Sequence, residues 1–200
     1  MNSVRRICVF CGSSPGGEPA FLAEAAQLGR ELSRRGIGLV FGGARVGLMG
    51  AVAAEVSSNG GEVIGVLPRQ LAVPGIRFEG AAQMHLVDSM SERKFLMAQM
   101  SDAFVVLPGG LGTMDEIFEV ATSGQLSMHG KPFGILNGSG YYDDLFRFLD
   151  RVTSFGFMRP KDRARWIEES DAGRLLSQIE SHHYGSICGT GRDGNPPRNS

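Results

Sequence analysis

The 200-residue sequence has only three cysteines and four histidines, which limits its covalent and metal chemistry. An odd number of cysteines cannot all pair within one chain, and Cys8 and Cys11 lie in or beside an apolar segment. We expect both to pack as small hydrophobic side chains in a reducing cytosol, because Cys-x-x-Cys spacing alone is weak evidence for a redox pair. The few histidines offer little for a metal centre, so no metal site is predicted.

Long apolar runs and an excess of charge of either sign are also missing. The apolar run at residues 7–11, which follows Arg5 and Arg6, is too short for a signal peptide or a membrane span. The formal net charge of −1 creates no field that would favour nucleic acid or an anionic membrane. We therefore expect a cytoplasmic protein whose partners are small molecules, with neither nucleic acid nor a membrane among them.

The chain does contain regularly alternating strand-like and helix-like patterns. With 42% hydrophobic residues and 29 glycines, it has enough apolar side chains for one sizeable core and many loops. Strands are expected at residues 4–10, 37–41, 63–67, 84–87, 103–107, 133–136 and 165–168, and helical patterns at 19–35, 48–58, 90–100, 117–126, 141–152 and 172–181.

This alternation predicts βαβ crossovers and therefore a parallel sheet with helices on both faces. The expected fold class is α/β: a single, three-layer, doubly wound, Rossmann-like domain for nucleotide-phosphate binding at residues 1–181. Residues 182–200 have little to bury and are expected to form a flexible C-terminal tail. Ligands of such sheets bind beyond the carboxyl ends of the strands, so the glycine-rich loops after the first, second and fifth strands should converge on one crevice.

The densest motif follows the fifth predicted strand, in the string Pro-Gly-Gly-Leu-Gly-Thr-Met-Asp-Glu at residues 108–116. Glycines let the backbone approach a ligand, and the unpaired N–H groups of a following helix point at it. We expect a phosphate here, with Glu116 beside it, held by Gly109, Gly110, Gly112 and Thr113. The alternative is structural, because Thr113 and Glu116 also fit a T-x-x-E capping box that only satisfies the start of a helix.

Two common nucleotide-binding motifs are absent. No G-x-G-x-x-G follows the first strand, where Gly12 precedes two serines, and no carboxylate ends the second strand. No Gly-Lys-Ser/Thr follows any strand, so a Walker-type phosphate loop is missing as well. NAD chemistry and ATP hydrolysis are therefore disfavoured, and no cofactor is expected.

A second informative segment lies just before the fifth strand. Ser89 and Glu92 have capping-box spacing, which places Arg93 in the first turn of a helix and on its inward, apolar face. An inward arginine needs an anionic partner, because an unpaired buried charge is expensive. That partner is Glu116 or a ligand phosphate, with a purely structural ion pair as the alternative. Lys94 falls on the flank of the helix and is predicted to be a solvated cation.

Together these residues resemble the Lonely guy family of cytokinin-activating nucleotide phosphoribohydrolases, whose members are often labelled lysine decarboxylases. The resemblance covers about residues 7–159. It is carried by Gly42-Gly43 through Gly47-Leu48-Met49-Gly50, by Glu92-Arg93-Lys94, and by Pro108-Gly109-Gly110-x-Gly112-Thr113-x-x-Glu116.

The resemblance implies hydrolysis of the N-glycosidic bond of a purine nucleoside 5′-monophosphate, AMP or an N6-modified AMP, to free base and ribose 5-phosphate. In family terms Arg93 and Glu116 match the catalytic pair, and the loop from Gly109 to Thr113 matches the phosphate cradle. Further substrate contacts are expected from Ser13, Gly43, Met90, Lys94 and Glu119. Members of the family are usually homodimers with the pocket close to the subunit interface, and a homodimer is expected here.

The residue types also suit this chemistry. Cleavage of a ribosyl C–N bond passes through an oxocarbenium-like state, so a carboxylate such as Glu116 can stabilise positive charge or activate water. The leaving purine gains negative charge, which Arg93 can offset. Arginine is a poor proton donor because the pKa of a guanidinium exceeds about 12, so we expect an electrostatic and orienting role for Arg93.

Three positions depart from the family pattern. Ser91 stands where His is common, Ser123 stands where Trp is common, and Ala44 replaces a third glycine. Ser123 shares a helical stripe with Glu116 and Glu119, so its small side chain could reshape the base pocket or the dimer contact. These differences leave the base preference open.

Other functions would use some of the same residues. A non-catalytic nucleotide carrier would use the same loops and keep Glu116 as a helix cap, and a ribohydrolase could act on another nucleoside monophosphate. A pyridoxal-phosphate decarboxylase needs a desolvated Schiff-base lysine. It is disfavoured because none of the three lysines, Lys94, Lys131 and Lys161, is expected to be desolvated.

Overall fold

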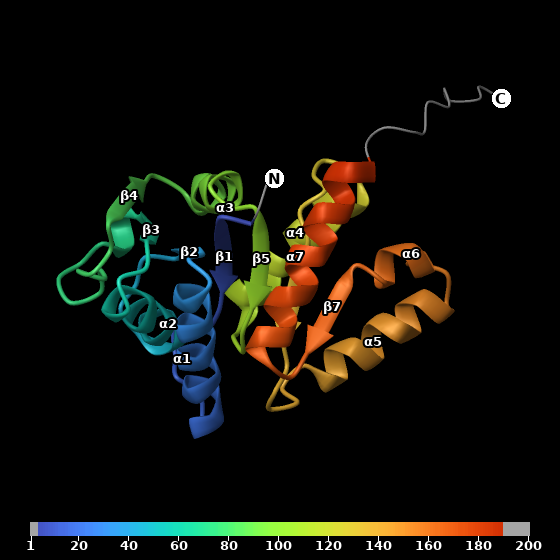
Figure 1. The fold of residues 1–200 in the computed structure, drawn as a ribbon, viewed down its shortest axis with the longest axis horizontal. Coiled ribbons are helices and arrows are strands. Elements are labelled where there is room, and N and C mark those ends of the chain that lie inside the picture. Colours follow the sequence, from blue (N-terminus) through green and yellow to red (C-terminus); the bar gives the residue numbers. More distant parts are fainter. Residues whose placement is uncertain (1–3, 190–200) are drawn as a thin grey trace.

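Seven parallel strands form one sheet in the order β4-β3-β2-β1-β5-β6-β7 within the described part of the chain (Figure 1). The computed structural model describes residues 4–189, with side chains described for residues 4–183. Each strand overlaps its predicted range. The strands are β1 (Arg6–Phe10), β2 (Gly38–Phe41), β3 (Val63–Pro68), β4 (Gln83–Val87), β5 (Ala103–Val106), β6 (Phe133–Leu136) and β7 (Trp166–Glu169).

The sheet is doubly wound, as the alternating pattern predicts. From β1 the chain adds β2, β3 and β4 on one side, then returns to place β5 on the other side of β1, where Ile7 pairs with Ala103. The loops that leave β1 and β5 therefore start side by side at the point where the winding reverses. Ligands of open α/β sheets bind at this switch point, beyond the carboxyl ends of the strands.

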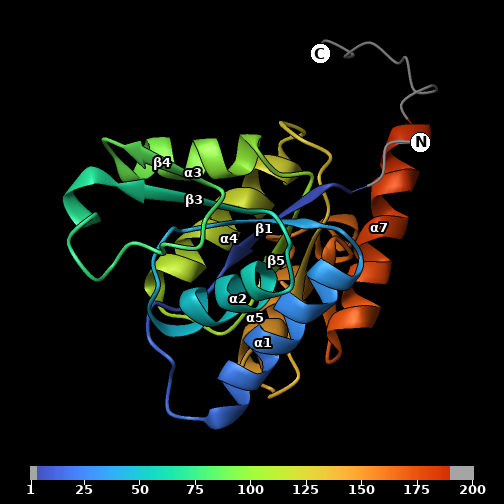
Figure 2. The same cartoon turned by 60° about the vertical axis from the view of Figure 1, so that its left-hand side comes forward.

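Helices cover both faces of the sheet and give the predicted three layers (Figures 1 and 2). One layer contains α1 (Pro19–Arg34), α2 (Gly47–Ser58) and α7 (Ala172–Gly189), and the other contains α3 (Met90–Gln99), α4 (Leu111–Gln125) and α5 (Asp143–Ser154). Each layer has its own core, built around Leu28, Val52 and Leu175 on one side and Met97, Ile117 and Phe146 on the other. Because both faces of the sheet are buried, the sequences of its strands are continuous apolar runs.

The two cysteines of the first strand region are buried and unpaired, as expected. Cys8 is fully buried and Cys11 is 7% exposed, and both are free thiols. Burial raises the pKa of each thiol, which keeps it protonated and unreactive at neutral pH. They act as small hydrophobic side chains on opposite faces of the sheet. The side chain of Cys188 lies outside the described residues.

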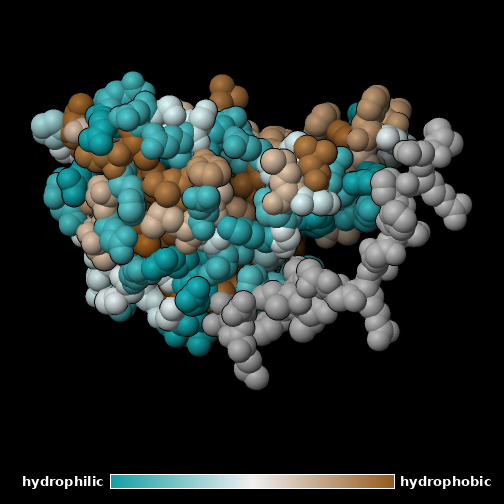
Figure 3. Space-filling model, turned by 90° about the horizontal axis from the view of Figure 1, so that it is seen from above, coloured by the Kyte–Doolittle hydropathy of each residue, from teal (hydrophilic) through white to brown (hydrophobic). Residues whose placement is uncertain are grey.

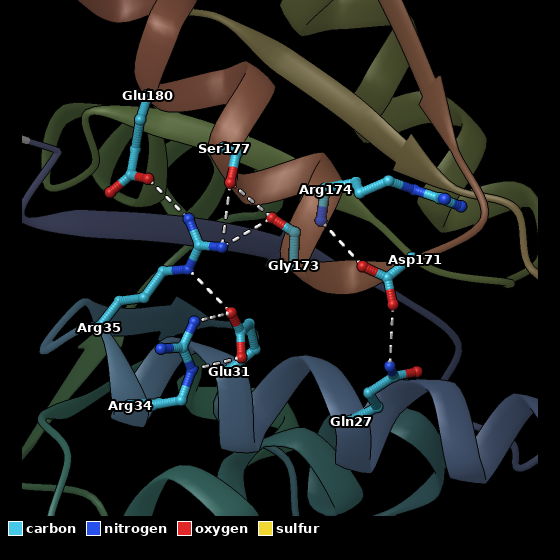
Figure 4. A network of polar contacts seen from close by, with 9 residues as sticks. All are labelled: Gln27, Glu31, Arg34, Arg35, Asp171, Gly173, Arg174, Ser177 and Glu180. Carbon is cyan, nitrogen blue, oxygen red and sulfur yellow. Dashed lines mark hydrogen bonds and ion pairs between the residues drawn. The ribbon is translucent and has the colours of Figure 1, made fainter.

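A polar network centred on Arg35, the C-cap residue of α1, fastens α7 to α1 (Figure 4). The Arg35 guanidinium donates to Glu31 at 3.0 Å, to Glu180 at 2.7 Å and to the carbonyl of Gly173 at 2.7 Å. Its side chain is only 15% exposed, so these bonds are partly shielded from water. The network therefore joins two helices of the same layer that are far apart in the sequence.

The predicted boundary between the domain and its tail needs correction. The helix predicted to end at residue 181 continues to Gly189, so residue 182 lies inside α7. Extending a docked helix costs little, because each added residue gains a hydrogen bond once the first turns are formed. Residues 190–200, the rest of the predicted tail, lie outside the described residues.

Two short helices were not predicted from the sequence. The 3₁₀ helix η1 (Arg69–Leu71) follows β3, and the single-turn helix α6 (Pro160–Arg163) precedes β7. Neither is long enough to show a hydrophobic period. Among the described residues, no helix has both the length and the apolar character needed to cross a bilayer.

Candidate active site

The loops after β1, β2 and β5 meet at the carboxyl edge of the sheet, as predicted. The N–H of Gly12, after β1, donates to the carbonyl of Pro108, after β5, at 2.9 Å. The N–H of Leu48, at the start of α2, donates in turn to the carbonyl of Gly12 at 3.1 Å. These bonds hold the loops from both sides of the switch point in contact.

The loop after β5 leads directly into the N-terminus of α4. Gly110 is the N-cap residue and α4 begins at Leu111, with no side-chain cap. The capping-box alternative for Thr113 and Glu116 is therefore wrong, because the helix starts earlier than that pattern requires. Thr113 lies in the first turn and Glu116 in the second. The first N–H groups of α4 have no acceptor within the helix, which leaves them available to an anion.

Glycine serves different purposes at different positions of this loop. A Cβ on Gly109 would lie 2.1 Å from Oγ1 of Thr113 and 2.9 Å from the backbone nitrogen of Gly12, so only glycine fits. A Cβ on Gly110 or Gly112 would meet nothing within 4 Å. Gly109 therefore serves packing of the loop, whereas Gly110 and Gly112 border open space where a ligand can approach the backbone.

A cavity of about 290 Å³ lies over this loop. Ser13, predicted as a substrate contact, is exposed in its wall, opposite Gly109 and Gly110. The remaining walls come from the loop after β1 and from three side chains that the sequence analysis did not select: Phe21, Leu48 and Tyr141.

Arg93 and Glu116 form a buried ion pair. Nη1 of Arg93 donates to Oε1 of Glu116 at 2.6 Å, and the two side chains are 10% and 8% exposed. Arg93 comes from the first turn of α3 and Glu116 from α4, and Nε of Arg93 also donates to the carbonyl of Val66 at 3.2 Å. The inward position expected for Arg93 is confirmed, and Glu116 is the one of its two expected partners that it binds in this structure.

Gly42, at the end of β2, makes room for the Arg93 guanidinium. A Cβ at Gly42 would lie 2.0 Å from Nη2 of Arg93 and 2.9 Å from Sδ of Met49. No L side chain can be placed at that distance without moving one of them. Gly42 therefore leaves the space that the Arg93 guanidinium occupies in the ion pair. The sequence pattern alone did not reveal this role.

Burial and charge act on Glu116 in opposite directions. Desolvation raises the pKa of its carboxyl group above the ordinary value, and the adjacent Arg93 lowers it. The net shift is upward, which indicates that burial is the stronger effect. A buried carboxylate that an ion pair keeps ionised is more reactive than an exposed one, because little water solvates its charge.

If the ionised carboxylate of Glu116 is the working form, activity should fall as the pH drops through its raised pKa. The acid limb of the kcat profile should therefore lie above about 4.3, the ordinary value for glutamate. The measurement is kcat at a saturating concentration of the expected substrate, AMP, since the phosphate of the free nucleotide itself titrates near pH 6. A limb at or below the ordinary value would show that Glu116 does not control turnover.

Lys94 is not the solvated cation that its flank position suggested. Its ammonium group donates to Asp115 at 2.8 Å and also pairs with Glu119, and its side chain is 16% exposed. Both carboxylates raise the pKa of Lys94. These partners lie on α4, so the pairing bridges α3 and α4 beside Glu116, a contact that helical spacing on α3 alone cannot show.

A small cavity of about 60 Å³ lies between α3 and α4, next to Glu116. The predicted stripe of Glu116, Glu119 and Ser123 lines one side of it, which confirms that spacing. The other lining residues are Phe10, Lys94, Ala98, Val120 and His129. The small Ser123 side chain therefore stands at a cavity wall beside the buried carboxylate.

Two predicted substrate contacts lie farther from the loop cavity. Gly43 has a φ of 78°, and a Cβ there would lie 3.0 Å from Cβ of Leu67 and 3.2 Å from Sδ of Met84. Gly43 is thus a turn residue packed on β3 and β4. Met90, the first residue of α3, is 43% exposed and borders neither cavity described above.

The lysines bear on the decarboxylase alternative. Lys131 is half-buried, which contradicts the expectation that no lysine is desolvated, and burial lowers its pKa. Its Nζ donates to the carbonyl of Ala98 at 2.7 Å. Lys131 precedes β6 and therefore lies at the amino edge of the sheet, the edge opposite the loop after β5.

A cavity of about 570 Å³ also opens at that amino edge, beside Arg5 and Arg6. Arg6 is already engaged there, because it binds both carboxylate oxygens of Glu62 at 2.8 and 2.9 Å. The C-terminal ends of α1, α2 and α3 surround the cavity, and helix C-termini favour cations over anions. The carboxyl edge is therefore the better site for a phosphate.

Comparison with known proteins agrees with this geometry. Residues 49–179 match the family model described as "Possible lysine decarboxylase". The chain is 46% identical over 178 residues to the probable cytokinin riboside 5′-monophosphate phosphoribohydrolase LOGL5 of Oryza sativa subsp. japonica, covering 89% of this chain and 72% of that protein. It is 44% identical over 178 residues to the cytokinin riboside 5′-monophosphate phosphoribohydrolase LOG7 of Arabidopsis thaliana, covering 89% and 82%.

Solved structures share the fold at lower identity. The Moco carrier protein from Chlamydomonas reinhardtii superposes with a TM-score of 0.69 and 20% identity, covering 91% of this chain and 99% of that one. The molybdenum cofactor binding protein from Rippkaea orientalis gives 0.68 and 21%, covering 89% and 96%. At such identities the likeness shows the fold alone. The sequence relatives show more: this chain belongs to the Lonely guy family of cytokinin riboside 5′-monophosphate phosphoribohydrolases.

Proposed function

We propose that this protein hydrolyses the N-glycosidic bond of a purine nucleoside 5′-monophosphate and releases the free base and ribose 5-phosphate. The observation that carries the proposal is the buried pair of Arg93 and Glu116, one helical turn from an open, glycine-bordered helix N-terminus. The curated relatives are named for this activity on cytokinin riboside 5′-monophosphates.

In the proposed complex the phosphate binds the N–H groups at the start of α4. Gly110, Gly112 and Thr113 supply the cradle, and Ser13 closes it from the loop after β1. Thr113 and Glu116 are three residues apart, which corresponds to slightly less than one turn and about 4.5 Å of helix rise. That spacing suits a ribose between the phosphate and the carboxylate. Binding energy from the phosphate then serves to hold the anomeric carbon at Glu116.

Glu116 is the residue we assign to the reacting carbon. Its Oε1 is held by Arg93, and Oε2 faces the sugar in this proposal, where it stabilises the oxocarbenium-like state or orients the attacking water. Arg93 keeps the carboxylate ionised and provides positive charge for the departing purine. Lys94 and Glu119 act more remotely, by joining α3 to α4 around the pair.

The substrate we propose is AMP or an N6-modified AMP such as a cytokinin riboside 5′-monophosphate. Purified protein should release adenine from AMP, or the modified base from its riboside monophosphate, with equimolar ribose 5-phosphate. The corresponding nucleosides serve as matched controls, because they lack only the phosphate and should be cleaved far more slowly. Binding of these nucleotides without release of any base would support a carrier, and cleavage of a pyrimidine nucleotide alone would support another ribohydrolase.

We also propose a homodimer formed through α3 and α4. Both helices carry large apolar side chains that a monomer leaves in water: Phe95 is 62% exposed on α3, and Leu111 and Leu126 are 89% and 66% exposed at α4. Figure 3 shows hydrophobic residues on several parts of the surface, including the side where β3 and β4 lie. Exposed apolar surface of this kind marks protein interfaces. The candidate site lies between the same two helices, so the interface would border it.

Replacing Phe95 with glutamate should convert this dimer to a monomer, because a carboxylate cannot be buried there without a partner. Sedimentation velocity at micromolar concentration measures the change. The matched control is Leu22→Glu on α1, in the opposite helix layer, where Leu22 is 40% exposed. A wild-type monomer, or equal dissociation by both variants, would argue against this interface.

We place the protein in the cytoplasm. The support is its pair of buried, unpaired thiols, which are stable in a reducing compartment. Fractionation of the native cells with an antibody tests this, and recovery in a secreted fraction would contradict it.

A further inference from the structure

Two adjacent tyrosines, Tyr141 and Tyr142, donate hydrogen bonds to the loop after β5, which is the proposed phosphate loop. The hydroxyl of Tyr141 donates to the carbonyl of Gly109 at 2.8 Å, and the hydroxyl of Tyr142 donates to the carbonyl of Leu107 at 2.8 Å. Between them, the carbonyl of Pro108 accepts from the N–H of Gly12 at 2.9 Å. The carbonyl oxygens of residues 107, 108 and 109 are therefore all held by donors, directly before the predicted anion site.

The orientation of these carbonyls decides what the loop can bind. In a trans peptide the C=O and the next N–H point in opposite directions. Fixing the carbonyl of Gly109 therefore also fixes the N–H of Gly110, the N-cap residue of α4. A rotated Gly109–Gly110 peptide would instead turn a carbonyl oxygen toward an anion and repel it. Because glycine permits many backbone dihedral angles, the Gly109–Gly110 peptide would rotate easily without the hydrogen bond from Tyr141.

The loop after β6 places both tyrosines. Asn137, at the end of β6, is 8% exposed, and its Oδ1 accepts from the N–H of Tyr142 at 2.8 Å. Its Nδ2 donates to Asp143 at 2.8 Å and to Glu168 at 2.7 Å. Gly140, with a φ of 72°, makes the turn that brings the tyrosines back over β5. The pair is thus anchored to β6 and β7, away from the loop it holds.

The hydroxyl groups of the two tyrosines bind peptides with different capacities to contact an anion. Tyr142 is 2% exposed, and the peptide that it holds ends in Pro108, which has no N–H to offer an anion. Tyr141 is 46% exposed, lies in the wall of the 290 Å³ cavity, and packs edge-on against Phe21 at 5.5 Å between ring centroids. Of the two hydroxyl groups, only that of Tyr141 holds a peptide, Gly109–Gly110, that lines the cavity and carries an N–H.

We propose that Tyr141 is a positioning residue for the substrate phosphate: its hydroxyl holds the Gly109–Gly110 peptide so that the Gly110 N–H stays directed at the anion. The inference rests on the proposed function for the identity of the ligand, a sugar 5-phosphate. Tyr142 fixes the end of β5 and contributes to stability rather than to phosphate binding.

The test compares Tyr141→Phe with Tyr142→Phe. Each variant keeps its ring and loses one hydroxyl, so the two form a matched pair. Calorimetry with ribose 5-phosphate should show Tyr141→Phe binding about fivefold more weakly than the wild type, the loss expected for one hydrogen bond. Tyr142→Phe should bind like the wild type but melt at a lower temperature, because a buried carbonyl loses its donor.

A second comparison separates positioning from simple wall packing. Tyr141→Phe should raise KM for AMP by a similar factor with kcat nearly unchanged, while the Kd for adenosine, which has no phosphate, stays constant. Equal losses for AMP and adenosine, or ribose 5-phosphate binding that Tyr141→Phe leaves unaltered, would overturn the inference. Because ribose 5-phosphate binding needs no turnover, a wild type that binds it but cleaves no nucleotide would refute the proposed function and leave this inference standing.

Discussion

Replacing Glu116 with glutamine is expected to lower kcat for AMP hydrolysis by about a thousandfold, in the range that a general acid–base or charge-stabilising group supplies. Glutamine keeps the size of the side chain and can still accept a hydrogen bond from Arg93, but it carries no charge to stabilise an oxocarbenium-like state. The affinity for AMP should change little, because the phosphate loop, which supplies most of the binding in this account, is untouched.

The measurement is single-turnover release of adenine, with AMP binding followed separately by calorimetry. Glu79→Gln is the control, since Glu79 is exposed in the loop between β3 and β4 and should leave both values unchanged. If Glu116→Gln retained the wild-type rate, Glu116 would be a structural partner of Arg93 and the chemistry would have to come from another group.

The second large effect is expected from a motif residue for which the sequence suggested no role of its own, in the variant Gly42→Ala. The added Cβ would lie 2.0 Å from Nη2 of Arg93, so the guanidinium must move. Arg93 cannot move freely, because it is bonded to Glu116 at 2.6 Å and to the carbonyl of Val66 at 3.2 Å. A displacement of about 1 Å at such a site can cost about a hundredfold in kcat/KM, and overpacking costs about 1–3 kcal/mol of stability.

Steady-state kinetics with AMP and thermal unfolding together test this prediction. The matched control is Gly17→Ala, because a Cβ on Gly17 would meet nothing within 4 Å. Gly17→Ala should keep wild-type activity and stability. A Gly42→Ala variant with wild-type kcat/KM would show that the position of Arg93 is not critical for the reaction.

Much of the architecture could be predicted because it depends on local patterns. Buried parallel strands appear as apolar runs, and each predicted strand overlaps an observed one. The inward position of Arg93 followed from helical spacing, and its need for an anion pointed to Glu116. These inferences worked because a buried charge restricts its partners to very few residues.

Other features failed because several local arrangements satisfy the same pattern. Thr113 and Glu116 have capping-box spacing, yet Gly110 takes the N-cap position and frees Glu116 for Arg93. Lys94 has an exposed flank on its own helix, but Asp115 of α4 partners it. In both cases the deciding contact lies on another element, which the pattern along one helix does not contain.

The supporting residues of the site were the hardest to find from sequence. Gly42 has its role only because the Arg93 side chain crosses it, and Tyr141 only because its hydroxyl reaches Gly109. A signal existed for the second: polar and aromatic residues directly after β6 must lie at the carboxyl edge, where ligands of such sheets bind. Gly42 belongs to a glycine pair that carried the resemblance, but nothing in its sequence context shows that it makes room for Arg93.

The proposed reaction requires a phosphate on the α4 N-terminus that holds the anomeric carbon at Glu116, and a crystal structure of Glu116→Gln with AMP would reveal both contacts. We expect the phosphate on the N–H groups of residues 110–113 and C1′ about 3–3.5 Å from the side-chain amide at position 116, a reactive distance. A phosphate bound instead beside Arg5 and Arg6, or a sugar turned away from residue 116, would contradict it.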